Sequence, residues 1–113
     1  MTQSTDVMRV ETTVDGREGA ERLAGSVVEH HLAACAQVSG PIRSFYRWEN
    51  EVRSDEEWMV VVKTAADRLD DLVAHLVEAH PYDVPEIVAV PVTGGNPEYL
   101  SWVRDETRGS GVA

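Results

Sequence analysis

Cysteine is almost absent from this 113-residue chain, which contains only Cys35. A single thiol excludes a disulfide within the chain and any zinc site built from several cysteines. Cys35 follows two alanines on a short apolar run, and no basic side chain nearby in the sequence would stabilise a thiolate. We therefore expect an inert, buried thiol.

Basic residues are also scarce, with 10 Lys and Arg against 20 Asp and Glu and a net charge of −10. Nucleic-acid binding depends on neutralising phosphates with basic side chains, so this composition argues against nucleic acid as a partner. The same reasoning disfavours anionic membranes. A strongly acidic surface attracts cations weakly and keeps a protein in solution.

Long apolar runs are missing. No stretch approaches the roughly 20 residues that span a bilayer, and no apolar signal segment opens the chain. We expect a soluble cytoplasmic protein with no membrane partner. The length predicts one domain over residues 1–113, with polar or glycine-containing ends at 1–5 and 107–113 that we expect to be disordered.

Between these ends, the hydrophobic pattern alternates between strand and helix periods. The expected order is strand, helix, strand, strand, helix, strand and a terminal helix. This order predicts an α+β, ferredoxin-like (split βαβ) fold, an antiparallel sheet of four strands with two helices on one face. The expected elements are at 6–14, 16–32, 33–48, 56–63, 64–80, 86–92 and 96–106.

Polar residues mark the expected start of each helix. Asp15 with Glu18, and Thr64 with Asp67, have the spacing of a capping box. Asn96-Pro97 has the residue types preferred at the N-cap and first helical position. We therefore expect side-chain caps at all three starts.

The stretch from Ser44 to Lys63 predicts a long β-hairpin with a compact polar turn at residues 49–51 and a bend at Gly40-Pro41. The first arm, which reaches back from Trp48 to Ala34, extends roughly 45 Å at about 3.3 Å per residue, somewhat less after the bend, whereas a helix of roughly 16 residues covers only about 24 Å. The hairpin should overshoot the helices and expose aromatic side chains, so we expect another copy of the chain to cover it. The predicted interface residues are Phe45, Tyr46 and Trp48.

Five ordered motifs give the chain a specific resemblance. They are LAACA at 32–36, YRWE at 46–49, KT at 63–64, HPYDVPEI at 80–87 and GNPEYLSW at 95–102. Together the chain from about residue 7 to residue 104 resembles the CutA family of divalent-cation tolerance proteins. The resemblance implies a homotrimer similar to the PII signalling proteins, and a role in tolerance of divalent cations, copper above all. It brings no established catalytic activity.

His80 is the candidate metal ligand. It ends the second long helix before a stiff Pro-Tyr turn, and imidazole suits copper, nickel and zinc. The alternative is a histidine that interacts with the helix dipole. In copper-binding relatives the site is associated with a His-His pair here and a cysteine near the end of the first strand. The corresponding residues in this chain are Ala79 and Thr12.

The other histidines have poor chelating spacings. His30 and His31 are neighbours on a helix, so their side chains diverge by about 100°. His75 and His80 are five residues apart. We expect structural or solvent-exposed roles for His30 and His31.

A second set of residues suggests a ligand cleft in which a lysine, carboxylates and a tyrosine meet an aromatic wall. Such a cleft suits a small polar ligand, as in a PII-like sensor, or acid-base chemistry in an enzyme of unknown reaction. The alternative is an ion pair and packing anchors at an interface. We expect a protein without catalytic activity. The set comprises Lys63, Glu49, Glu57, Tyr82, Glu86, Tyr99 and Trp102, with Trp48.

Overall fold

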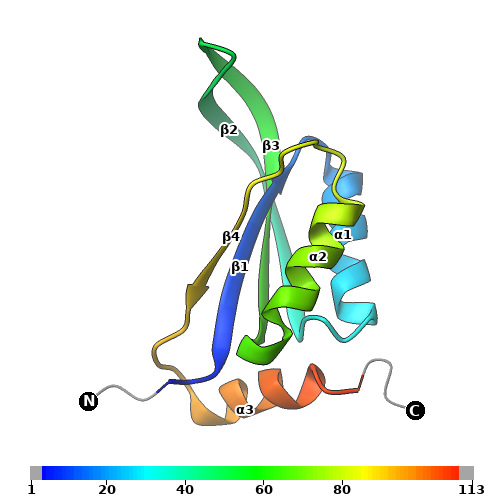
Figure 1. Cartoon of the computed structure of the whole chain (residues 1–113), viewed down its shortest axis with the longest axis vertical. Coiled ribbons are helices and arrows are strands. Elements are labelled where there is room, and N and C mark those ends of the chain that lie inside the picture. Colours follow the sequence, from blue (N-terminus) through cyan, green and yellow to red (C-terminus); the bar gives the residue numbers. More distant parts are fainter. Residues whose placement is uncertain (1–3, 110–113) are drawn as a thin grey trace.

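A four-stranded antiparallel sheet carries two helices on one face in the computed structural model, which describes residues 4–109 (Figure 1). The strand order is β2-β3-β1-β4, and both neighbours of β1 run antiparallel to it. The predicted α+β class and split βαβ order are confirmed. The elements are β1 (Val7–Val14), α1 (Arg17–Glu29), β2 (Cys35–Trp48), β3 (Glu51–Ala65), a 3₁₀ turn (Ala66–Arg68), α2 (Leu69–Ala79), β4 (Ile87–Pro91) and α3 (Pro97–Glu106).

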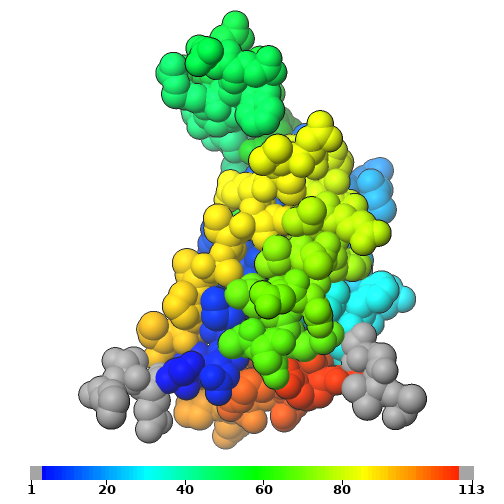
Figure 2. All heavy atoms as spheres, in the orientation of Figure 1, coloured from blue at the N-terminus to red at the C-terminus, as the bar shows by residue number. Residues whose placement is uncertain are grey.

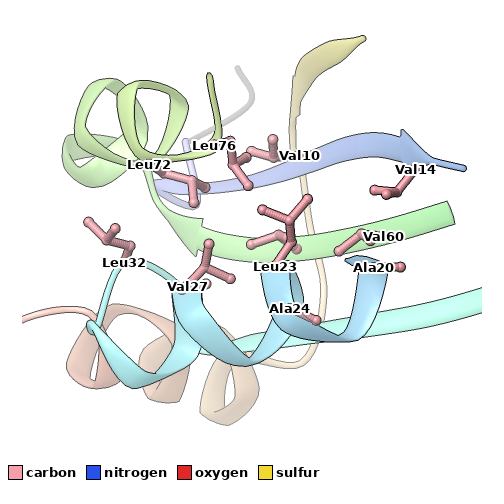
Figure 3. Packing of buried hydrophobic residues seen from close by; sticks show 12 residues of the cluster. Val10, Val14, Ala20, Leu23, Ala24, Val27, Leu32, Val60, Leu72 and Leu76 are labelled. Atoms are coloured by element: carbon pink, nitrogen blue, oxygen red, sulfur yellow. The ribbon is translucent and has the colours of Figure 1, made fainter. Parts of the chain in front are cut away.

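The main core lies between the sheet and helices α1 and α2 (Figure 3). Side chains alternate along a strand, so every second residue of β1 and β3 points to the helices. On the helices, apolar residues recur every three or four positions and form a stripe that meets them. The core includes Val10, Val14, Leu23, Val27, Val60, Val62, Leu72 and Leu76.

A smaller apolar cluster anchors α3 across the base of the sheet (Figure 1). Leu100 and Val103 of α3 pack with Val7 and Ala34. The helix begins as predicted, because the Asn96 side chain accepts a hydrogen bond of 3.0 Å from the backbone N–H of Glu98, and proline follows at the first helical position.

The other two predicted caps are wrong. Helix α1 begins after Gly16 without a side-chain cap, so Asp15 does not fill that role. Thr64 does not open α2, because β3 continues through Ala65 in register with β1. Thr64 is fully buried instead, and its hydroxyl donates a 2.7 Å hydrogen bond to the carbonyl of Leu32. The extended ladder and this buried bond outweigh the local capping signal.

The hairpin of β2 and β3 closes with a two-residue turn at Glu49 and Asn50. Both residues are left-handed, with φ of 52° and 64°. A turn with two positive φ values matches the right-handed twist of the paired strands. The predicted compact connection is therefore confirmed.

A bulge divides the hairpin where the sequence predicts a bend. The pairing register shifts between Ser39 and Ile42. Gly40 has a φ of 152°, and a Cβ atom placed on it would lie 2.7 Å from the Trp58 ring. Only glycine fits here, because Trp58 lies directly against the backbone and the φ value disfavours a side chain.

Beyond the bulge, residues 43–56 form a distal arm that extends past the helices (Figures 1 and 2). Residues 51–56 of β3 are all exposed. On this arm Phe45 is 72% exposed and Val52 is 67% exposed. Residues 4–109 thus leave these two apolar side chains of the arm largely uncovered.

At both ends the fold includes residues that the sequence placed in the expected tails. Thr107 is fully buried, and its hydroxyl donates to the carbonyl of Val103 at 3.0 Å. Arg108 donates two hydrogen bonds to the carboxylate of Asp67, one of them at 2.7 Å. At the other end, Arg104 donates to the Thr5 carbonyl at 2.8 Å. The rest of the expected tails, 1–3 and 110–113, lies outside the described residues.

Candidate functional site

A cleft lies where the distal arm leaves the body of the protein. Its walls come from the arm, from the end of β1 and from the loop that joins α2 to β4. Figure 1 shows this loop passing over the end of β1, and Figure 2 shows the arm standing clear above it. The cleft has a volume of about 880 Å³, which is within the usual size of small-molecule sites.

A hydrogen-bonded pair forms the polar centre of this cleft. The Tyr82 hydroxyl donates to Glu57 Oε2 at 2.8 Å, and Glu57 is only 8% exposed. Burial, and then the hydrogen bond to Glu57, raise the pKa of Tyr82 well above its ordinary value. At neutral pH the phenol is therefore protonated and can donate a hydrogen bond but cannot act as a base. Glu86 lines the same cleft.

The cleft is strongly acidic and partly aromatic. Tyr46 and Trp48 of the distal arm line one side, and Arg53 is the only basic residue among the lining side chains. Carboxylates and aromatic faces both attract cations, so the cleft favours cationic over anionic ligands. The lining carboxylates are Asp15, Asp55, Glu56, Glu57, Asp83 and Glu86.

The structure divides the predicted cleft residues among three places. Glu57, Tyr82 and Glu86 meet in the cleft, but Lys63 does not join them. Lys63 lies nearer the base of the sheet, between Arg9 of β1 and Cys35 of β2 in the strand register. The correction follows from strand length, because five residues of β3 lie between Glu57 and Lys63.

Glu49 lies in the turn at the tip of the arm, where its carboxylate accepts a 2.9 Å hydrogen bond from Trp48 Nε1. Tyr99 and Trp102 lie on α3 with their ring centroids 5.6 Å apart. Helix α3 crosses the opposite end of the sheet from the arm, so these two rings lie outside the cleft of the same protomer (Figure 1).

Near the base of the sheet, Cys35 Sγ lies 3.3 Å from the hydroxyl of Tyr99. This hydrogen bond, together with burial, raises the pKa of Tyr99 to about 12. Cys35 is partly buried rather than fully buried. The Cys35 thiol, which the sequence predicts to be inert and buried, thus lies beside the protonated phenol of Tyr99.

His80 is a buried histidine whose two ring nitrogens are both engaged. It is 7% exposed, and its Nε2 lies 2.9 Å from the carbonyl oxygen of Thr13. Its Nδ1 accepts a 3.1 Å hydrogen bond from the backbone N–H of Tyr82, which assigns the proton to Nε2. To bind a metal, His80 would have to give up a hydrogen bond.

The surroundings of His80 supply no further strong metal ligand. Thr12 places a hydroxyl 3.1 Å from Nε2, and Ala79 contributes only a methyl group. Among residues 4–109, no group of three or more His, Cys, Asp or Glu side chains converges to hold a metal ion.

The structure brings together two histidines that sequence spacing does not connect. His30 follows the end of α1 and His75 lies in α2, and their ring centroids are 5.3 Å apart. Ser26 of α1 hydrogen-bonds to both rings. The pairing arises from the packing of one helix on the other, which helical periodicity within either segment cannot reveal.

No helix among residues 4–109 combines the length and the apolar character needed to cross a membrane.

Comparison with known proteins identifies the family. The model of the CutA1 divalent ion tolerance protein family matches residues 8–106. The chloroplastic protein CutA of Arabidopsis thaliana is 43% identical over 99 residues, which are 88% of this chain and 54% of that protein. The divalent-cation tolerance protein CutA of Thermus thermophilus is 43% identical over 95 residues, 84% of this chain and 92% of that protein.

A solved structure has the same fold. The crystal structure of CutA1 from Oryza sativa superposes with a TM-score of 0.89 at 41% identity, covering 95% of this chain and 98% of that one. The chain spans little more than half the length of the Arabidopsis relative, but nearly all of the Thermus relative and of the rice structure. Sequence, fold and coverage agree, and the chain belongs to the CutA1 divalent ion tolerance protein family.

Proposed function

We propose that this protein acts in tolerance of divalent cations, copper above all, as a homotrimer in the cytoplasm and without catalysis. The observation that carries the proposal is the family match over residues 8–106, supported by relatives named for divalent-cation tolerance. The strongly acidic composition suits a cationic ligand.

Growth of a strain lacking the gene tests this role. We expect the wild-type chain to restore growth in copper-supplemented medium. Unchanged growth would contradict the proposal. Fractionation of the same cells tests the location, and recovery of the protein outside the cytoplasmic fraction would contradict that part.

The exposed apolar surface supports assembly. Phe45, Tyr46 and Trp48 project from the distal arm, and Val88 and Val90 of edge strand β4 are about half exposed. Edge strands β2 and β4 each present unpaired backbone groups within one protomer. Copies of the same chain would cover both features, in a PII-like trimer.

Light scattering at low micromolar concentration tests the assembly. We expect about three times the protomer mass of 12.5 kDa. A monomer at that concentration would contradict the trimer, because an obligate assembly should persist under these conditions.

The residues around His80 do not fit a copper site of the kind that the family resemblance implies. A threonine hydroxyl and an alanine occupy the two associated positions, and both nitrogens of His80 are hydrogen-bonded inside the fold. We therefore propose that His80 stabilises the fold. Calorimetric titration with Cu²⁺ tests whether His80 is a ligand. We expect the purified His80→Gln protein to bind Cu²⁺ like the wild type, and weaker binding would show that His80 holds the metal.

The acidic cleft favours a second candidate function, a sensor of a small organic cation. Glu57 and Tyr82 supply a buried polar anchor, and Trp48 supplies an aromatic wall. A thermal-shift screen of amines tests this candidate, because a true ligand raises the melting temperature with concentration. The shift should disappear in the Glu57→Gln protein, and a shift that persists would place the ligand elsewhere.

A further inference from the structure

Two histidines meet on the helical side of the sheet, away from the acidic cleft. His30 is exposed and His75 is half-buried, and their rings are tilted by 44° with centroids 5.3 Å apart. His30 directly follows α1 and His75 lies in α2, and these two helices cover one face of the sheet. Solvent ions can therefore reach the pair.

Ser26 holds both rings in place. His30 Nδ1 lies 2.8 Å from the Ser26 carbonyl oxygen, so Nδ1–H donates and Nε2 keeps its lone pair. His75 Nε2 lies 2.6 Å from the Ser26 hydroxyl oxygen, and among residues 4–109 its Nδ1 has no hydrogen-bond partner. Metal-binding histidines commonly use one nitrogen for a hydrogen bond to a carbonyl or hydroxyl and the other for the metal.

The separation of the rings suits one shared ion. With a metal–nitrogen distance of about 2.1 Å, each ring centroid lies about 3.2 Å from the metal. At a tetrahedral angle the two centroids are then about 5.2 Å apart. The observed 5.3 Å agrees with this value. At a right angle the separation falls to about 4.5 Å, which a small rotation of the exposed His30 ring would supply.

We propose that His30 and His75 form a two-histidine site for a divalent cation of the class that prefers imidazole, namely Cu²⁺, Ni²⁺ or Zn²⁺. Water completes the coordination. Ser26 is a positioning residue that fixes both rings. The affinity order for nitrogen ligands places Cu²⁺ above Ni²⁺ and Zn²⁺.

The site gives the proposed tolerance function a place where the metal can bind, and to that extent rests on it. Its geometry is independent of that function, because it follows from the packing of α1 on α2. The competing explanation is that the histidines only link the two helices through Ser26. That explanation predicts an effect on stability and none on metal binding.

Calorimetric titration of the metal-free full chain with Cu²⁺ and Zn²⁺ tests the site. We expect saturable binding of one ion per chain, tighter for Cu²⁺, and at least about tenfold weaker binding in His30→Gln and in His75→Gln. The matched control is His31→Asn, since His31 is the adjacent exposed histidine, contacts Glu106, and has a φ of 57° that asparagine tolerates. Binding in the control should equal that of the wild type.

Absence of saturable Cu²⁺ binding, or equal binding in the wild type and the His30→Gln/His75→Gln double variant, would overturn the site. Melting curves without metal confirm that each variant is folded. Electron paramagnetic resonance of the Cu²⁺-loaded protein gives a second readout. We expect nitrogen coupling that the double variant loses, and an unchanged spectrum would overturn the site even if the variant were less stable.

The growth assay above distinguishes the two proposals. If titration shows the site but the chain confers no copper tolerance, the tolerance function fails and the site stands. If the double variant has lost Cu²⁺ binding but still confers tolerance, the site stands as a binding site and tolerance proceeds without it.

Discussion

The two halves of the β2–β3 hairpin have the same backbone pairing and opposite surroundings. In the proximal half, residues 35–39 and 57–65, the side chains of Val60 and Val62 are fully buried under the helices. In the distal arm, Phe45 and Val52 are mostly exposed. The same pair of strands thus contributes to the buried core at one end and presents an uncovered apolar surface at the other.

The difference shows that apolar residues on a paired strand are not always buried within the fold of one chain. A fully buried valine or phenylalanine contributes about 1.5–3 kcal/mol relative to an exposed one. The proximal half gains this energy when the chain folds. The distal arm would gain it only if another molecule covered the arm, so in the proposed trimer folding and assembly would depend on different parts of the same hairpin.

The strongest test of this comparison is Trp48→Asp. We expect it to dissociate the proposed trimer, because three charges would be buried without partners and each costs several kcal/mol. Light scattering should report a smaller particle, while circular dichroism remains that of a folded chain. The control is Val77→Asp, which adds the same charge to an exposed apolar position of α2. A trimeric Trp48→Asp protein with unchanged melting would show that Trp48 is not at the interface.

Leu72→Ala tests the body of the protein. Leu72 is fully buried between the helices and the sheet, so we expect a loss of about 2–5 kcal/mol in the free energy of unfolding, measured with urea. Val77→Ala on the exposed face of the same helix should change it by less than about 0.5 kcal/mol. Similar losses in the two variants would contradict the assignment of the core.

His80→Gln tests the junction between body and arm. The ring links the end of β1 to the turn after α2 through Thr13 and Tyr82. Leaving buried backbone groups unpaired costs about 1–3 kcal/mol, which urea unfolding should show. Particle mass should not change. A stability equal to that of the wild type would mean that water or the glutamine replaces both bonds.

The smallest expected effect is a pH dependence. The pKa of Tyr82 is raised in the folded protein above its unfolded value near 10.0. Above pH 10 the unfolded phenol ionises while the folded one keeps its proton, so unfolding is favoured as pH rises toward the folded pKa. The contribution of the protonated Tyr82 phenol to the free energy of unfolding is fully present below pH 10 and is lost as the pH rises through the folded pKa. Between pH 9 and 11 the melting temperature of Tyr82→Phe should fall less than that of the wild type, and equal falls would exclude Tyr82 as the cause.

Much of the fold is predictable from sequence because its signals are local and agree with one another. Alternation in β1 and β3, the polar turn at Glu49-Asn50 and the cap at Asn96 each describe a single segment. The caps at Asp15 and Thr64 fail because the same residue types also suit turns and strands. At Thr64, the buried ladder decides between these possibilities.

The site is less predictable because it depends on which segments meet. Glu57 and Lys63 are close in sequence, yet the length of one strand places them at different ends of the sheet. His30 and His75 are far apart in sequence and adjacent in space. Residue types suggested the polar chemistry of the cleft, whereas the sequence indicated only a structural or solvent-exposed role for His30. In both cases only the packing of whole elements shows which side chains lie together.

The packing of the Trp58 ring against Gly40 makes its fluorescence a probe of the bulge. Trp58 lies at the bulge, Trp48 on the distal arm and Trp102 on α3, so each of the three tryptophans lies in a different part of the molecule. Fluorescence from a variant that keeps only Trp58 would report folding of the bulge. A variant that keeps only Trp48 would report contact with a neighbouring chain in the proposed trimer. The natural tryptophans would therefore separate the kinetics of folding from those of the proposed subunit association.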